Sequence, residues 1–174
     1  YGDHRDLHLS LRRQRQMCIR DSYRDALIPI WRELNLSPLL DNPHRQQGQP
    51  LTGFGLMLLR SDVAKIGNVL SAENSFLKKY LDQSMFKKAM QKDSSDRGFM
   101  AGSDDLRYKN GFWAWNARQT LECSKDIWLP FMSGYGGISA VLLPTGNLYY
   151  YFSDGGVFHY SEVIKHLSKT KSIC

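Results

Sequence analysis

The sequence predicts an α+β fold, in which helices come first, an antiparallel sheet follows, and one helix closes the chain. Three observations support this fold class. Apolar residues recur at helical spacing before Asp93. From Leu106 onward, alternating and aromatic-rich segments are typical of strands. After Ser161 the helical spacing returns. Helices grouped ahead of strands indicate an α+β arrangement and not a regular βαβ alternation.

The first predicted helix follows Asp25, which is a suitable N-cap, and has Pro29 in its first turn, where a missing N–H costs least. Its apolar stripe is Leu27, Ile30, Trp31 and Leu34. The prolines and glycine of 36–50 predict a loop. The short apolar segment 53–59 is expected to be buried and closely packed.

Two further helices are predicted before the sheet. Ser61 is a good N-cap for a helix that turns Val63, Ile66 and Leu70 inward. Asn74 starts a longer helix, and the polar segment 93–105 that follows it is predicted to be a surface loop. The i+4 row of this longer helix is Leu77, Leu81, Met85 and Ala89.

The strands are predicted from 106–116, 138–144 and 148–154. The turn Pro144-Thr145-Gly146-Asn147 between the last two segments indicates a hairpin. Ser161 then caps a closing helix, whose apolar positions are Val163, Ile164 and Leu167.

Tyr1–Ser22 resembles the translation of a short-read sequencing adapter. Tyr1–His8 back-translates to the flow-cell end of the adapter, Leu9–Leu11 to its index barcode, and Arg12–Ser22 to a stretch that ends in the transposase recognition sequence. The adapter has a stop codon directly before the tyrosine codon, which accounts for a chain that lacks an initiating Met. We therefore expect Tyr1–Ser22 to be an artefact, disordered or non-native, and the domain to occupy 23–174.

Without Tyr1–Ser22 the net positive charge of the chain is smaller. Lys plus Arg falls from 23 to 18 and Asp plus Glu from 17 to 14, so the net charge falls from +6 to +4 (18 − 14). The run RRQRQ, typical of a nucleic-acid-binding arm, lies inside the removed segment. The remaining lysines are scattered as on solvated helix faces, so we expect no nucleic-acid partner. No apolar run is long enough to span a bilayer.

Cys123 and Cys174 remain after the removal, and their spacing matches no metal motif. A single bridge between them and two free thiols are both consistent with the sequence. The histidines His44, His159 and His166 have no spacing typical of zinc ligands. We expect no metal and no cofactor.

The segment 128–154 contains the strongest candidate for a functional motif. In it, Ser133-Gly134-Tyr135-Gly136-Gly137 precedes an apolar strand. Glycines here permit a positive φ or the close approach of a ligand or a second backbone. A plain tight turn or β-bulge explains the same residues. A phosphate cradle is excluded, because the glycines precede a strand and not a helix.

The aromatic residues of the strands allow two interpretations. Trp113, Trp115 and Tyr149–Tyr151 are compatible with ligand stacking in a non-catalytic β-rich binding module. Alternation places both tryptophans on one face, which favours core packing against helices.

Three segments carry a family resemblance: GYGGISAVLLPTG with the aromatic strand and last helix after it, QPLTGFGLMLLRSDVAKIGNVL, and GFWAWN. They resemble the serine β-lactamase/penicillin-binding-protein-like hydrolases, closest to the group of class C β-lactamases, esterases and 6-aminohexanoate-oligomer hydrolases. The resemblance implies a partial β-lactamase-like fold and an acyl-serine hydrolysis of a small-molecule amide or ester.

In that family a Ser-x-x-Lys element supplies the nucleophile, a tyrosine transfers protons, and a Lys/His-Thr/Ser-Gly element on the sheet edge binds substrate. The third element falls at Met132-Ser133-Gly134, where Met132 replaces the basic residue. The resemblance thus implies a substrate-binding role for Ser133, Gly134, Tyr135, Gly136 and Gly137.

No residue of the chain is predicted to be catalytic. Ser75, Ser84 and Ser168 each precede a lysine at the family's spacing, but they follow the GFG segment, which the family's nucleophile precedes. Tyr108-x-Asn110 matches the tyrosine pattern, but Tyr108 lies only 25 residues before Ser133 (133 − 108), where the family has a far longer interval. We expect the nucleophile to have been encoded ahead of Tyr23, so that this C-terminal portion is inactive by itself. A sheet that lacks its N-terminal strands is expected to have an unpaired edge and an exposed apolar face.

Overall fold

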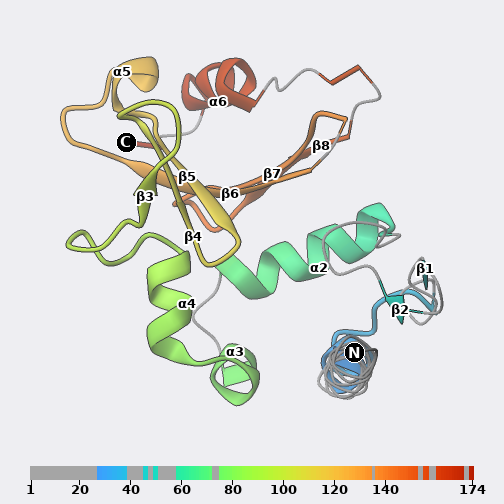
Figure 1. Cartoon of the computed structure of the whole chain (residues 1–174). Coiled ribbons are helices and arrows are strands. Elements are labelled where there is room, and N and C mark those ends of the chain that lie inside the picture. Colours follow the sequence, from blue (N-terminus) through green and yellow to red (C-terminus); the bar gives the residue numbers. More distant parts are fainter. Residues whose placement is uncertain are drawn as a thin grey trace, which may run out of the picture. The chain divides into compact units, whose positions relative to one another are not determined.

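The structure is a computed structural model and describes residues 27–38, 45–46, 49–50, 58–71, 75–134, 136–152, 155–156, 160–170 and 173–174. It has the predicted α+β composition, with helices, a six-stranded antiparallel sheet and a closing helix (Figure 1). The chain divides into two compact units, Tyr1–Asp62 and Val63–Cys174. The adapter-like segment Tyr1–Ser22 and the predicted cap Asp25 lie outside the described residues.

The first unit contains the predicted first helix at residues 27–33, where Leu34 N–H donates to the carbonyl of Ile30 at 3.0 Å. Pro29 is exposed on this helix, and the predicted start at Asp25 lies outside the described residues. The loop prediction for 36–50 is incomplete, because β1 (Arg45–Gln46) and β2 (Gln49–Pro50) pair there as antiparallel strands. Each has only two residues, too few to produce a detectable alternation.

The next helix begins two residues earlier than predicted, and a different group caps it. The helix α2 (Arg60–Ser71) begins before Ser61, and its cap is made by the carboxylate of Asp62. Asp62 is buried and accepts hydrogen bonds from the N–H groups of Leu59 at 3.0 Å and Ser37 at 2.9 Å. A carboxylate at the third helical position that accepts from the cap N–H is half of a capping box. Leu59 is 48% exposed, contrary to the predicted burial of 53–59, whose other residues before Leu58 lie outside the described part.

In the second unit α2 packs against the sheet through a glycine. Val63 is buried and Ile66 and Leu70 are half-buried, as predicted. A Cβ added to Gly67 would lie 2.4 Å from Cδ2 of Leu148, so the absence of a side chain lets the helix approach the sheet.

The predicted long helix from Asn74 is two helices, α3 (Ser75–Tyr80) and α4 (Gln83–Ala89). Asp82 interrupts it, because its carboxylate accepts a hydrogen bond from Met85 N–H at 2.8 Å and so caps α4. The interruption breaks the predicted apolar row, and Leu81 and Met85 are exposed. Phe86 and Met90 are buried in their place.

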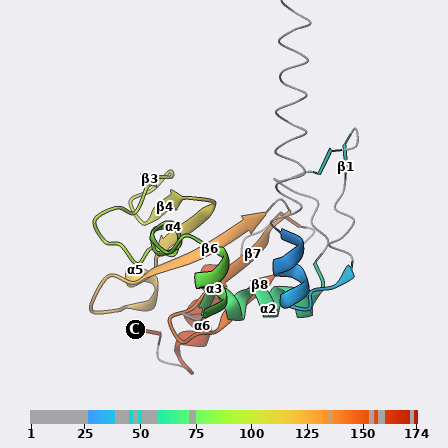
Figure 2. The ribbon, with the colours of Figure 1, turned by 90° about the horizontal axis from the view of Figure 1, so that it is seen from below.

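The main sheet is a meander in which every strand pairs with the next one along the chain. Figure 2 shows two neighbouring strands of the meander, β6 and β7, side by side. The strands are β3 (Phe99–Met100), β4 (Leu106–Lys109), β5 (Phe112–Asn116), β6 (Trp128–Gly134), β7 (Ile138–Leu142) and β8 (Leu148–Tyr151).

Two hairpins define the register of the sheet. The predicted strand 106–116 is split into β4 and β5 at Asn110–Gly111, where both residues have positive φ (49° and 85°). Asn-Gly with two positive φ angles is the favoured two-residue hairpin turn. The predicted hairpin between β7 and β8 is confirmed, with Gly146 N–H donating to Leu143 at 3.1 Å. The predicted loop 93–105 contains the short strand β3.

Each face of the sheet packs on different helices (Figure 1), so the described part does not show the exposed apolar face expected of a sheet without its N-terminal strands. One face holds the larger core and lies against α6 (Tyr160–Ser168), which begins one residue before the predicted cap Ser161. The other face packs on α4 and on the part of α2 that contains Val69 and Leu70. The buried residues of the larger core are Trp115, Ala117, Leu129, Phe131, Val141, Ile164 and Ile173. Those of the smaller core are Phe86, Met90 and Leu142.

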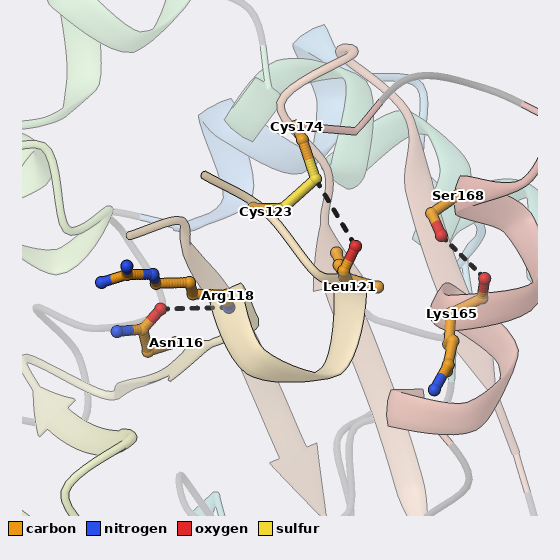
Figure 3. The surroundings of a disulfide bond; sticks show 7 residues. All are labelled: Asn116, Arg118, Leu121, Cys123, Lys165, Ser168 and Cys174. Atoms are coloured by element: carbon orange, nitrogen blue, oxygen red, sulfur yellow. Dashed lines mark hydrogen bonds between the residues drawn. A yellow bond between two sulfur atoms is a disulfide. The ribbon is translucent and has the colours of Figure 1, made fainter. Parts of the chain in front are cut away.

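A short helix that the sequence did not predict, α5 (Arg118–Leu121), follows β5. Cys123, just beyond it, forms a disulfide with Cys174, which decides between the two possibilities that the sequence left open (Figure 3). The bridge fastens the end of α5 to the segment that follows α6.

Among the described residues, no helix combines the length and the apolar character needed to cross a membrane.

Candidate functional site

The end of β6 places a hydroxyl next to an open stretch of backbone. The register pairs β5 with β6 only from Trp113↔Phe131 to Asn116↔Trp128. Ser133 and Gly134 extend beyond this register and pair with β7 alone, opposite Ser139 and Ile138. Ser133 is exposed and Gly134 half-buried. Their peptide groups on the β5 side therefore have no strand partner among the described residues.

This arrangement differs from the expected sheet edge. β6 is an interior strand, with β5 on one side and β7 on the other. Its last three residues, 132–134, lie beyond the register with β5 and form a local edge, because the Asn110–Gly111 turn ends β5 early.

The turn after β6 uses glycine for a conformational reason. Gly136 and Gly137 have φ values of 80° and 86°, which side chains disfavour. The Gly136 carbonyl accepts a hydrogen bond from Gly156 N–H at 3.3 Å, which joins this turn to the chain after β8. Gly137 is buried, and Tyr135 lies outside the described residues. The tight-turn interpretation of these glycines thus agrees with the observed backbone.

A second hydroxyl lies across from the first. Ser139 pairs with Ser133 on one side and with Tyr151 on the other, so the three residues share one face of the sheet. Ser139 is fully buried, and its Oγ has no hydrogen-bond partner in the described part of the chain. A buried hydroxyl without a hydrogen-bond partner lowers the unfolding free energy by about 1–3 kcal/mol, so such groups are rare in folded proteins.

The segment contains no charged group. From Ile127 to Ser153 the sequence has no Asp, Glu, Lys, Arg or His. Its titratable side chains are tyrosines, and burial, with a smaller contribution from Tyr151, raises the pKa of Tyr149. The segment therefore offers hydroxyls and backbone groups that can bind a carbonyl or an amide, but no general base at neutral pH.

The serines rejected as nucleophiles lie away from β6. Ser84 is exposed on α4. Ser168 Oγ donates to the Lys165 carbonyl at 2.7 Å, at the end of α6 (Figure 3). The side chain of Ser75 and the whole of Lys171 lie outside the described residues.

The aromatic side chains of β4 and β5 are packed together. Trp115 is buried in the larger core, and Trp113 packs against it. The Trp113 ring stacks on Phe131 at 6.2 Å between centroids and meets the edge of Tyr108 at 5.0 Å. Both tryptophans lie on the face that alternation predicts. Tyr108, the other rejected catalytic match, is part of this stack.

A polar cavity of about 670 Å³ was not predicted from the sequence. It lies where the β3–β4 connection, the end of β5 and α5 meet, and α5 itself was not predicted. Arg118 pairs with Asp126 there at 3.4 Å, between two exposed side chains. The lining residues are Asp104, Asp105, Asn116, Arg118, Gln119, Thr120 and Asp126.

Charged side chains elsewhere in the unit have structural partners. Arg97 and Arg107 lie over the Trp128 ring, at 4.9 and 5.5 Å from its centroid. Burial lowers the pKa of Arg97. A hydrogen bond from Lys109 lowers the pKa of Asp96. Within the described residues, no three His, Cys, Asp or Glu side chains are grouped to hold a metal ion.

Comparison with known proteins identified no relative. No family model matches the chain, and neither a curated protein nor a solved structure is similar to it.

Proposed function

We propose that 23–174 is the C-terminal portion of a serine hydrolase of the β-lactamase-like superfamily, and that it forms the substrate-binding side of the active site. The parent enzyme cleaves a small-molecule amide or ester through an acyl-serine intermediate. In this proposal Ser133 and the backbone of 133–137 bind the substrate, and the nucleophile and its lysine come from sequence ahead of Tyr23.

The observation that supports the proposal best is the local edge at Ser133–Gly134. An exposed hydroxyl lies beside peptide groups that have no strand partner on the β5 side among the described residues, ahead of a turn with two positive-φ glycines. Such groups can hold an acyl group and donate to a developing oxyanion. The absence of charged residues from Ile127 to Ser153 agrees with a segment that binds substrate and leaves the proton transfers to other residues.

The first test is hydrolysis by the chain itself. We expect no turnover of nitrocefin or p-nitrophenyl esters, because the binding segment has no base and no activated nucleophile. Turnover that a single Ser75→Ala or Ser84→Ala change abolishes would contradict the assignment, since those serines are placed outside the site.

The second test is binding at the local edge. Titration with a neutral anilide, followed by ¹H–¹⁵N NMR, is expected to shift the amide signals of Ser133, Gly134 and Gly137. Ser84 on α4 is the matched reference, and its signal is expected to stay fixed. Shifts that spread over α4 and leave 133–137 unchanged would overturn the proposed site.

Coding DNA from an adapter-free source should contain Ser-x-x-Lys and a catalytic tyrosine ahead of residue 23.

A further inference from the structure

The disulfide links two segments that are far apart in the sequence. Cys123 and Cys174 are 51 positions apart in sequence, with their Cα atoms 5.5 Å apart (Figure 3). The Sγ of Cys174 also lies 3.9 Å from the Leu121 carbonyl oxygen. The bridge therefore fixes the end of α5 next to the segment after α6.

The α5 helix is weak by itself. It has four residues, and Ala117 provides no side-chain cap. It ends at Glu122, whose φ of 59° is a left-handed conformation that costs a non-glycine residue energy. A single helical turn of this kind is not stable without tertiary contacts.

Ile173, the neighbour of Cys174, is 5% exposed and belongs to the larger core with Leu129, Val141 and Ile164. Cys123 is buried, but Cys174 is exposed and accessible to a soluble reductant.

We propose that the Cys123–Cys174 bridge is a redox-sensitive latch, which holds α5 and Ile173 against the core and releases both when a dithiol reduces it. A dithiol thiolate attacks the Sγ of Cys174, the exposed residue of the pair, and the Sγ of Cys123 leaves as a thiolate that takes up a proton. The second thiol of the reductant then displaces Cys174 as a thiol and closes the oxidised reductant. Two electrons and two protons pass from the dithiol to the protein.

The latch is tested by hydrogen exchange of the full chain, oxidised and in dithiothreitol. Two amides report on α5, because Leu121 N–H donates to Ala117 at 2.9 Å and Cys123 N–H donates to Arg118 at 3.0 Å. On reduction we expect their protection to fall roughly a hundredfold. Amides in the ladder between β6 and β7 should lose far less, because strand pairing there does not involve the bridge.

A Cys123→Ser/Cys174→Ser variant provides the matched control. It should show the low α5 protection in both conditions and no response to the dithiol. Thiol titration of the denatured, oxidised wild-type chain should find one free thiol, since two of its three cysteines are bridged (3 − 2 = 1).

Three results would overturn the latch. The first is three free thiols in the oxidised chain. The second is α5 protection that survives reduction. The third is an equal loss of protection in β6 and β7, because the bridge would then support the whole unit and not one segment.

Discussion

The face of the sheet that packs on α6 and the face that packs on α4 are both apolar, but they are closed in different ways. Under α6, seven buried residues form one core, which includes Leu129 and Ile164 at 0% exposure. On the α4 side the cluster of buried residues is smaller and consists of Phe86, Met90 and Leu142, with half-buried apolar neighbours. The disulfide lies at the larger core, beside Ile173.

The difference shows which contacts keep the unit folded. The α6 face gains stability from apolar area removed from water, at about 25 cal/mol per Å². The α4 face depends more on fit, because Gly67 lets α2 approach Leu148 and Asp82 starts α4 at the position that turns Phe86 inward. Deleting side-chain volume should therefore affect the first face most, and adding volume should affect the second.

The largest expected effect comes from a matched pair of leucine deletions. Leu129→Ala on the α6 face is expected to cost about 3–5 kcal/mol of unfolding free energy, since the site is surrounded by buried side chains and cannot collapse. Leu142→Ala on the α4 face is expected to cost about 2–3 kcal/mol, because half-buried neighbours can relax into the space. Urea unfolding of both variants measures the difference. Equal losses would contradict the comparison.

An added methyl group tests the fit of the α4 face. Gly67→Ala should cost about 1–3 kcal/mol, because the new Cβ would meet both Cδ2 and Cβ of Leu148 and a change of rotamer removes only the first contact. Asn68→Ala, at an exposed position of the same helix, is the control and should change stability by less than about 0.5 kcal/mol. A Gly67→Ala variant as stable as this control would show that α2 shifts without cost.

The sequence predicts the parts of the fold that local rules determine. The hairpin between β7 and β8 follows from a proline-glycine turn between two apolar segments, and the helix from Arg60 follows from its periodicity. The single long helix from Asn74 is a wrong prediction, because an apolar i+4 row competes there with a strong cap at Asp82. The Asn110–Gly111 turn was missed although its Asn-Gly signal is specific.

The candidate site could be predicted only in part. The glycines after Ser133 indicate a special backbone conformation, and positive φ at Gly136 and Gly137 agrees with it. The local edge depends on where β5 ends relative to β6, which is a matter of register and not of local sequence. The same holds for the polar cavity at α5, whose lining comes from segments that only the fold brings together.

The smallest expected effect is a loss of unfolding free energy at alkaline pH, which arises from Tyr160 on the α6 face. Tyr160 packs between Trp115 and Phe131, and burial, with a smaller contribution from the charge of Asp105, raises its pKa. A raised pKa means that the folded state holds the phenol proton more tightly than the unfolded state. The contribution of Tyr160 to the unfolding free energy is therefore constant below its unfolded pKa of about 10 and falls as the pH rises toward the folded pKa.

Tyr160→Phe should remove this fall, so the stabilities of the variant and the wild type should converge or cross between neutral and alkaline pH. Parallel stability curves for the two proteins across that range would show that the phenol of Tyr160 titrates alike in both states, and that packing on the α6 face does not exclude water from it.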